Sequence, residues 1–116
     1  RKALATCRRL TRAQGIDLVM RTHRLDALVA PTGGPAWLTD LVNGDHFGGG
    51  SSGLAAVAGY PSITVPAGRV FGLPVGLSFV AGAWEEGKLV RYAYAFEQAV
   101  RARRAPRFLA TAALRP

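Results

Sequence analysis

The spacing of apolar residues predicts helices near the start of the chain. One helical face of the first ten residues carries Ala3, Leu4, Cys7 and Leu10. Gly15 is placed to end this first helix, because glycine is the residue that most readily follows a helix C-terminus. Asp17 can cap a second, short helix that runs to about Arg24. We therefore expect two helices before the first strand.

A longer helix is predicted near the other end of the chain. Its buried stripe consists of Leu89, Ala93, Phe96 and Val100. Glu85 and Glu86 precede this stripe, where carboxylates suit the positive end of a helix dipole. Pro106 is expected to end the helix.

Three segments between these helices have the pattern of strands. The first is the short apolar run LDALVAP, from Leu25 to Pro31. The second and third are SITVPAG (62–68) and PVGLSFVAG (74–82), whose short connection predicts antiparallel pairing. Pro66 must then lie near a strand end or at an unpaired position. The order of elements predicts the α/β class, but three strands are few for a sheet, which points to part of a larger domain.

A long irregular segment separates the first strand from the second. Residues 32–50 are rich in glycine, contain Pro35 and include Trp37 and Phe47. Loops of this length in a compact domain usually have a function or cover another part of the molecule. The segment ends in GGGSSG, after which Ser51 or Ser52 is expected to cap a short helix over GLAAVA (53–58).

Glycines around two serines also raise the question of a catalytic serine. The pattern Gly-x-Ser-x-Gly occurs at 49–53, but no convincing strand precedes it, as a nucleophile elbow requires. A catalytic set would need His46 as the base, and the adjacent Asp45 is poorly placed in sequence to orient that imidazole. Asp26 or Asp40 could do so only through tertiary placement. We therefore favour a helix cap over a nucleophile at Ser51 and Ser52.

Composition narrows the remaining classes of function. The 116 residues are 49% hydrophobic and 19% charged, which fits one folded domain with a modest core. A single cysteine, Cys7, is expected to be a buried core thiol, and it excludes an internal disulfide. The net charge of +8 raises the question of a nucleic-acid partner. The arginines do not alternate with aromatic residues, however, which favours a solvated basic surface. No metal site, cofactor or membrane span is expected.

Several stretches together resemble the amidase signature family. They are AAVAGYPSITVPAG (55–68), GLPVGLSFVAGAWEEGKLVRYAYAFEQA (72–99), LDALVAPT (25–32) and RRAPRF (103–108). The resemblance covers nearly the whole chain, and it implies an α/β/α arrangement around a mixed β-sheet that this chain completes only in part. Members hydrolyse amides with a serine, a second serine in a cis peptide, and a lysine.

The resemblance also implies where the catalytic residues lie. In the family, the nucleophile stretch is followed by an acidic residue and then an arginine. Here no acidic residue follows GGGSSG before the next strand, and Thr64 stands where the arginine is wanted. The match is instead to a later region of the family, so the nucleophile, the cis-serine and the lysine are expected upstream of Arg1. Of the two lysines, Lys2 and Lys88, neither has a sequence context that would lower its pKa to that of a base.

The resulting prediction treats residues 1–116 as the C-terminal portion of a single amidase domain, a hydrolase of non-peptide C–N bonds, inactive alone. In the family, the loop before the AGYP helix borders the substrate pocket, so the predicted pocket-lining residues are Thr32, Trp37, His46, Phe47 and Ser52. Relatives that take glutamine carry an acidic residue near the position of Gly49, so an apolar amide is favoured over an α-amino acid amide.

The alternatives are the amidase subunit of a tRNA-dependent amidotransferase and a small basic nucleic-acid-binding module. The expected partner is a small-molecule amide, with no nucleic acid, no membrane and a possible homodimer. A cytoplasmic location is expected, although an N-terminus that starts inside a helix suggests a truncated chain.

Overall fold

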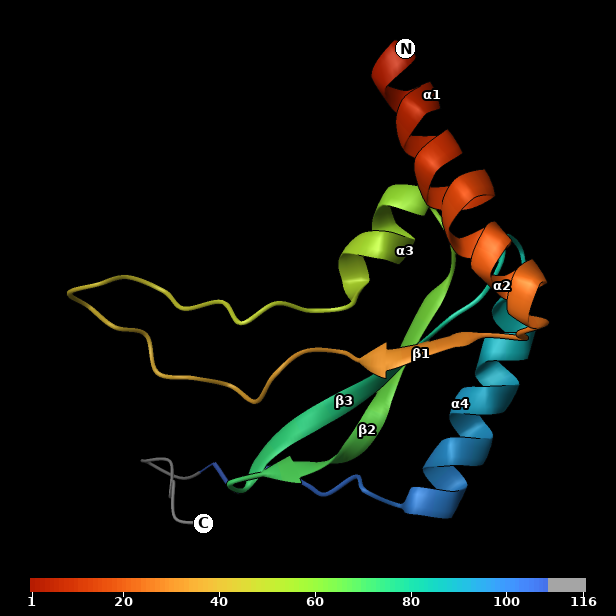
Figure 1. Cartoon of the computed structure of the whole chain (residues 1–116). Coiled ribbons are helices and arrows are strands. Elements are labelled where there is room, and N and C mark those ends of the chain that lie inside the picture. The colour runs from red at the N-terminus through yellow and green to blue at the C-terminus, as the bar shows by residue number, and fades with distance from the viewer. Residues whose placement is uncertain (109–116) are drawn as a thin grey trace.

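Three strands with helices on both faces form the body of the chain (Figure 1). The computed structural model describes residues 1–108. The elements in chain order are α1 (Lys2–Arg8), η1 (Arg9–Ile16), α2 (Asp17–His23), β1 (Leu28–Pro31), α3 (Ser52–Ala58), β2 (Ser62–Val70), β3 (Leu73–Val80) and α4 (Glu86–Val100). No helix among the described residues is long and apolar enough to cross a bilayer.

The sheet has the order β1-β3-β2, and both neighbouring pairs are antiparallel. The hairpin of β2 and β3 confirms the pairing predicted from their short connection. Its register shifts between Pro66 and Gly68, so the proline lies beside an irregularity, as a residue without a backbone N–H requires. The parallel pairs that make a sheet mixed would have to come from strands outside the described residues.

Helix α4 covers one face of the sheet. Leu89 and Ala93 are buried against Val65 and Phe79, and Phe96 packs edge-on to Phe79 with ring centroids 5.9 Å apart. These contacts confirm the predicted stripe except at its end, where Val100 is 44% exposed. The helix ends at Val100 rather than at Pro106, because Arg101 adopts the left-handed conformation. Its N–H then bonds the carbonyl of Glu97 and closes the last turn.

The N-terminal helices and α3 cover the opposite face. Ile16, Ala55 and Ala58 form a second buried cluster with Val80, and Leu28 packs against it. Paired residues of antiparallel strands lie on the same face, and Leu28 is opposite Val80. The sheet is therefore enclosed between two helical layers, which confirms the α/β/α arrangement.

The N-terminal helix departs from two predictions. Gly15 does not end it; the chain kinks there, at φ −118° and ψ −109°, and continues into α2. A Cβ at this position would lie 2.7 Å from the carbonyl oxygen of Leu10, which explains the glycine. Cys7 is exposed rather than buried, because no residue of α1 is enclosed by the rest of the described chain. A third prediction, Asp17 as the cap of α2, is wrong because the cap position is Ile16.

Asp17 instead ties the helices to the start of β2. The Tyr60 hydroxyl donates to the Asp17 carboxylate, with distances of 2.8 and 3.0 Å to its two oxygens. Arg12 donates from Nε to the carbonyl oxygen of Ala58 at 2.6 Å, and its guanidinium lies 5.0 Å from the centroid of the Tyr60 ring. Burial, followed by the hydrogen bond to Asp17 and its charge, raises the pKa of Tyr60 above the ordinary value of 10.0.

Replacing Tyr60 by phenylalanine is expected to destabilise the fold less at high pH than at pH 8. The folded state raises the pKa of this phenol, so its contribution is complete below pH 10 and falls as the pH rises through the folded value. Thermal melting of wild type and Tyr60→Phe between pH 8 and 11 should show the gap in Tm narrowing. Tyr94→Phe, at a tyrosine that is 64% exposed, is the matched control. A Tm gap that is independent of pH would contradict this account.

Candidate functional site

The irregular segment between β1 and α3 forms an extended arm, defined here as residues 33–50, that projects from the sheet (Figure 1). Its base is closed by backbone pairing. The N–H of Ser51 donates to the carbonyl of Thr32 at 3.1 Å, and Gly33 pairs with Gly50. A Cβ on Gly50 would lie 2.9 Å from the Thr32 oxygen, so the two sides approach closely only because this residue is glycine. The arm therefore leaves the sheet in a fixed direction.

The far end of the arm is a turn organised by Asp40. Its Oδ1 accepts from the backbone N–H groups of Val42 and Asn43, and its Oδ2 accepts from the Asn43 side chain. The N–H of Gly44 bonds the carbonyl of Asp40 at 2.9 Å. The Asn43 side-chain bond, followed by the two backbone bonds, lowers the pKa of Asp40 below its ordinary value. The turn leaves Leu41 and Val42 almost fully exposed at the tip.

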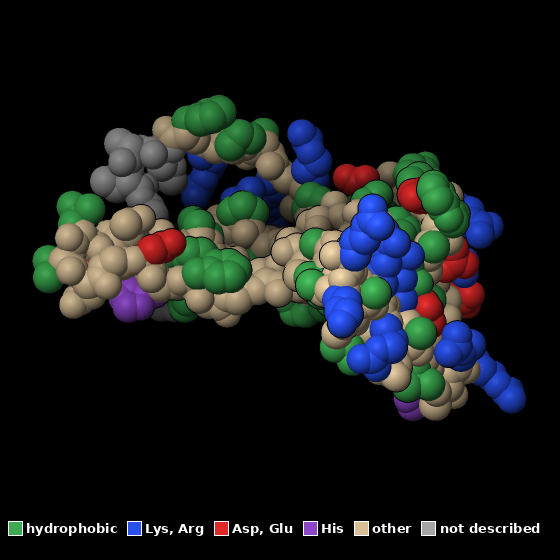
Figure 2. Space-filling view, turned by 90° about the horizontal axis from the view of Figure 1, so that it is seen from above, with side chains coloured by type: hydrophobic (Ala, Val, Ile, Leu, Met, Phe, Trp, Pro, Cys, Tyr) green, Lys and Arg blue, Asp and Glu red, His purple; other side chains and the backbone are tan. Residues whose placement is uncertain are grey.

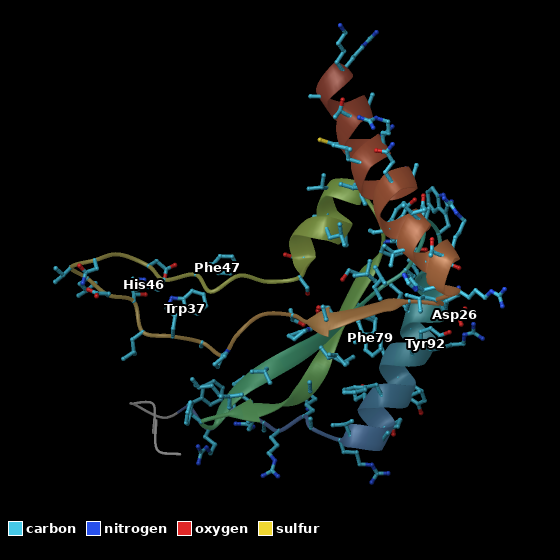
Figure 3. The ribbon with its side chains drawn as sticks, in the orientation of Figure 1. Asp26, Trp37, His46, Phe47, Phe79 and Tyr92 are labelled. Atoms are coloured by element: carbon cyan, nitrogen blue, oxygen red, sulfur yellow. The ribbon has the colours of Figure 1, made fainter. Side chains whose placement is uncertain are left out.

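An aromatic pair joins the two sides of the arm between its base and its tip. Trp37 and Phe47 lie with ring centroids 6.0 Å apart and ring planes at 49° (Figure 3). The indole N–H of Trp37 donates to the carboxylate of Asp45. The predicted residues Trp37, His46 and Phe47 therefore lie on the same part of the arm, and all three are exposed.

Two further predicted residues lie at the base of the arm. Thr32 is turned into the sheet: its hydroxyl lies 2.7 Å from that of Ser78 and donates to that of Thr64 at 3.3 Å. The Thr64 and Ser78 hydroxyls are 2.9 Å apart, so the hydroxyl that follows β1 and those of β2 and β3 satisfy one another. Ser52 begins α3 and is exposed. Four of the predicted residues therefore lie on the arm or at its base with accessible side chains, namely Trp37, His46, Phe47 and Ser52. The fifth, Thr32, has its side chain hydrogen-bonded within the sheet.

The serine pair has a different environment from the one predicted. Ser51 occupies the cap position of α3, but its side chain makes no capping hydrogen bond, and its Oγ is buried without a partner in the described chain. Beside it lies a pocket of about 250 Å³ with an apolar lining from β1, β3 and α3. Asp45 is engaged by Trp37, and the structure assigns no hydrogen bond between His46 and either serine. The arrangement lacks the base that a serine nucleophile needs.

Lys88 is held as an ammonium group. Its Nζ lies 2.5 Å from Glu85 Oε1 and 3.6 Å from the carboxylate of Asp26. The hydrogen bond to Glu85 is the main cause that raises the pKa of Lys88, which opposes a role as a general base. Among residues 1–108, no group of three or more His, Cys, Asp or Glu side chains could hold a metal ion.

Sequence reasoning missed Asp40 and Asp45 as the residues that shape the arm. The run Asp40-Leu-Val-Asn-Gly is a recognisable turn signal, because an aspartate side chain commonly binds backbone N–H groups two and three residues later. No local pattern pairs Trp37 with Asp45, since the contact spans eight residues of irregular backbone.

Comparison with known proteins gives the same family as the motifs. No family model matches the chain. A probable amidase of Arabidopsis thaliana is 36% identical over 109 residues, which are 93% of this chain and 18% of that protein. One subunit of the glutamyl-tRNA(Gln) amidotransferase of Clostridium kluyveri is 34% identical over 105 residues, 87% of this chain and 21% of that protein.

Solved structures give closer matches. The peptide amidase PAM in complex with the competitive inhibitor chymostatin is 55% identical, with a TM-score of 0.87 over 92% of this chain and 22% of that one. The native peptide amidase of Stenotrophomonas maltophilia is 53% identical, with a TM-score of 0.82 over 92% of this chain and 21% of that one. The chain therefore spans about a fifth of the length of the relatives that it matches. With this identity, this fold and the AGYP and GLPVG motifs, the chain belongs to the amidase signature family and corresponds to a segment of its members.

Proposed function

We propose that this chain is the C-terminal part of an amidase that hydrolyses carboxamides to the acid and ammonia or an amine. The single observation that carries the proposal is the match to peptide amidases, at 53–55% identity over 92% of this chain. The match to the amidotransferase subunit is weaker, at 34% identity, which favours a hydrolase over ammonia transfer to tRNA. The extent of exposed apolar surface, with Leu41 at 95% and Trp84 at 91%, fits a segment that packs against more protein.

The reaction would use residues upstream of this chain. A serine nucleophile needs a group to take its proton, and the family supplies this with a second serine and a lysine. Here Lys88 is paired with carboxylates, and Lys2 lies on exposed helix α1. We therefore propose that residues 1–116 alone are inactive.

The contribution of this chain would be to form part of the substrate pocket. The proposed lining residues are Trp37, His46 and Phe47 on the arm and Ser52 at its base. Thr32 would act indirectly, because its side chain binds within the sheet while its backbone fixes the base of the arm.

The proposed substrate is a peptide or amino-acid derivative with an amide in place of its terminal carboxylate. The solved relatives named peptide amidases support this class. The bond broken would be the carboxamide C–N bond rather than an internal peptide bond. The family's acidic position falls near Gly49 in this chain, which favours a substrate whose α-amino group is blocked.

The test compares the complete polypeptide that contains this chain with residues 1–116 alone. The complete polypeptide should release ammonia from N-acetyl-phenylalaninamide and react with a fluorophosphonate probe, whereas residues 1–116 should do neither. Labelling of Ser51 or Ser52, or hydrolysis by residues 1–116, would contradict the proposal. A complete polypeptide without amidase activity on any N-acylated amide, or one that binds random oligonucleotides at moderate salt, would also contradict it.

A further inference from the structure

We propose that the aromatic pair Trp37–Phe47 binds the side chain next to the scissile amide, and that Asp45 holds the pair in place and disfavours acidic substrates. This inference rests on the proposed function, because it assigns a specificity to the same site. It names the substrate class more narrowly, as amides of residues with apolar or aromatic side chains.

The aromatic pair forms an accessible apolar wall, in which the two rings contact each other. Trp37 is 44% exposed and Phe47 is 71% exposed, so both rings offer surface to a ligand (Figure 3). Their mutual contact comes from opposite sides of the arm, so neither ring depends on a single stretch of backbone. Aromatic side chains that are already fixed lose little conformational entropy when a ligand covers them. These properties suit recognition of an apolar side chain.

Asp45 fixes the orientation of the wall. Its carboxylate accepts from the indole N–H of Trp37, which lies eight residues earlier on the other side of the arm. The residue next to Asp45 along the chain is His46, and Phe47 follows directly, so one short segment supplies both the second ring and the acceptor for the first. Asp45 is therefore a positioning residue whose charge lies beside the rings.

The sign of the charge on the arm is opposite to that of the chain as a whole. The sequence carries a net charge of +8, yet it has no lysine or arginine between Arg24 and Arg69. The charged residues of the arm are Asp40 and Asp45, and most of the basic side chains seen in Figure 2 gather over the helical end of the molecule. An anionic substrate side chain at the wall would meet like charge with no cation on the arm to offset it.

The test measures kcat/KM of the complete polypeptide for the N-acetyl amides of phenylalanine, leucine, glycine, glutamine and glutamate. Wild type should prefer phenylalanine and leucine, and it should favour glutamine over glutamate by roughly fivefold at low salt. Trp37→Ala should lower kcat/KM for phenylalanine about tenfold and change glycine little. Thr39→Ala, at an exposed polar position of the same arm, is the matched control and should leave all five values unchanged.

The variants at Asp45 separate its two roles. Asp45→Asn keeps an oxygen acceptor for Trp37 but removes the charge, so it should abolish the discrimination against glutamate and keep the preference for phenylalanine. Asp45→Ala removes both, so it should also raise KM for phenylalanine with little effect on kcat. Phe47→Leu provides a second test of the wall, and melting curves identify any variant that does not fold.

Results that contradict this inference can be told apart from results that contradict the proposed function. A uniform loss across the five substrates for Trp37→Ala and Phe47→Leu would overturn the wall, and unchanged discrimination in Asp45→Asn would overturn the charge effect. An equal effect of Thr39→Ala would show that the arm acts only through its fold. If wild type hydrolyses none of the amides, the proposed function itself is wrong, and this inference ends with it.

Discussion

Replacing Leu89 by alanine is expected to lower the free energy of unfolding by about 2–5 kcal/mol. Leu89 is 2% exposed and lies where α4 meets the sheet, in the cluster that contains Val65, Phe79 and Ala93. Truncation removes apolar contacts and leaves a cavity that two rigid layers can close only in part. Since α4 is anchored by only two fully buried side chains, the loss should be near the upper end of this range.

The matched control is Val90→Ala, one residue further along the same helix. Val90 is 56% exposed, and alanine has the higher helix propensity, so this change should alter stability by less than about 0.5 kcal/mol. Urea unfolding of residues 1–116 followed by circular dichroism measures both values. Equal losses for the two variants would show that α4 does not hold the sheet in the way that the structure indicates.

The contrast between these two positions shows what the sequence could predict about the fold. The period of Leu89, Ala93 and Phe96 indicated both the helix and its buried face, because an apolar stripe at this spacing has one stable arrangement on a sheet. The hairpin of β2 and β3 was also predictable, since a short connection forces antiparallel pairing. These features depend on local pattern alone.

The N-terminal helices show where local pattern was insufficient. Leu4, Cys7 and Leu10 have the same spacing as a buried stripe, but all three are exposed in the described chain. An apolar stripe on a helix shows which face can be buried, but it does not show whether another element covers that face. The role of Gly15 was also mispredicted, because its kink depends on the approach of the Leu10 carbonyl, a contact set by the path of the whole helix.

Some features of the candidate site were also predictable from the sequence, and others were not. Glycine content and Pro35 predicted a long irregular loop over 32–50, and the aromatic residues within it were found from their type. The pairing of Trp37 with Asp45 and the inward turn of Thr32 could not be predicted, because each depends on a partner far along an irregular backbone. The turn at Asp40 was within reach of sequence reasoning, since its hydrogen bonds are local.

Replacing Gly76 by alanine is expected to destabilise the sheet by about 1–3 kcal/mol. A Cβ at this position would lie 2.8 Å from Thr32 Oγ1 and 2.8 Å from Thr64 Cγ2. Alanine for glycine would otherwise stabilise a strand by restricting the unfolded chain, so the steric clash determines the sign of the effect. Because the N–H of Thr32 donates to the carbonyl of Gly76 at 2.9 Å, the same clash should also loosen the base of the arm.

Gly34→Ala is the control, because a Cβ there meets no atom within 4 Å and no left-handed backbone is involved. It should leave the unfolding free energy unchanged or raise it by up to about 1 kcal/mol. A second variant tests whether the clash with Thr64 causes the loss of stability, which urea titrations measure. Thr64→Ser removes the Cγ2 atom but keeps the hydroxyl that lies 2.9 Å from Ser78, so it should recover part of the stability lost in Gly76→Ala. If the two changes simply add their costs, contact with Thr64 is not what requires glycine in β3.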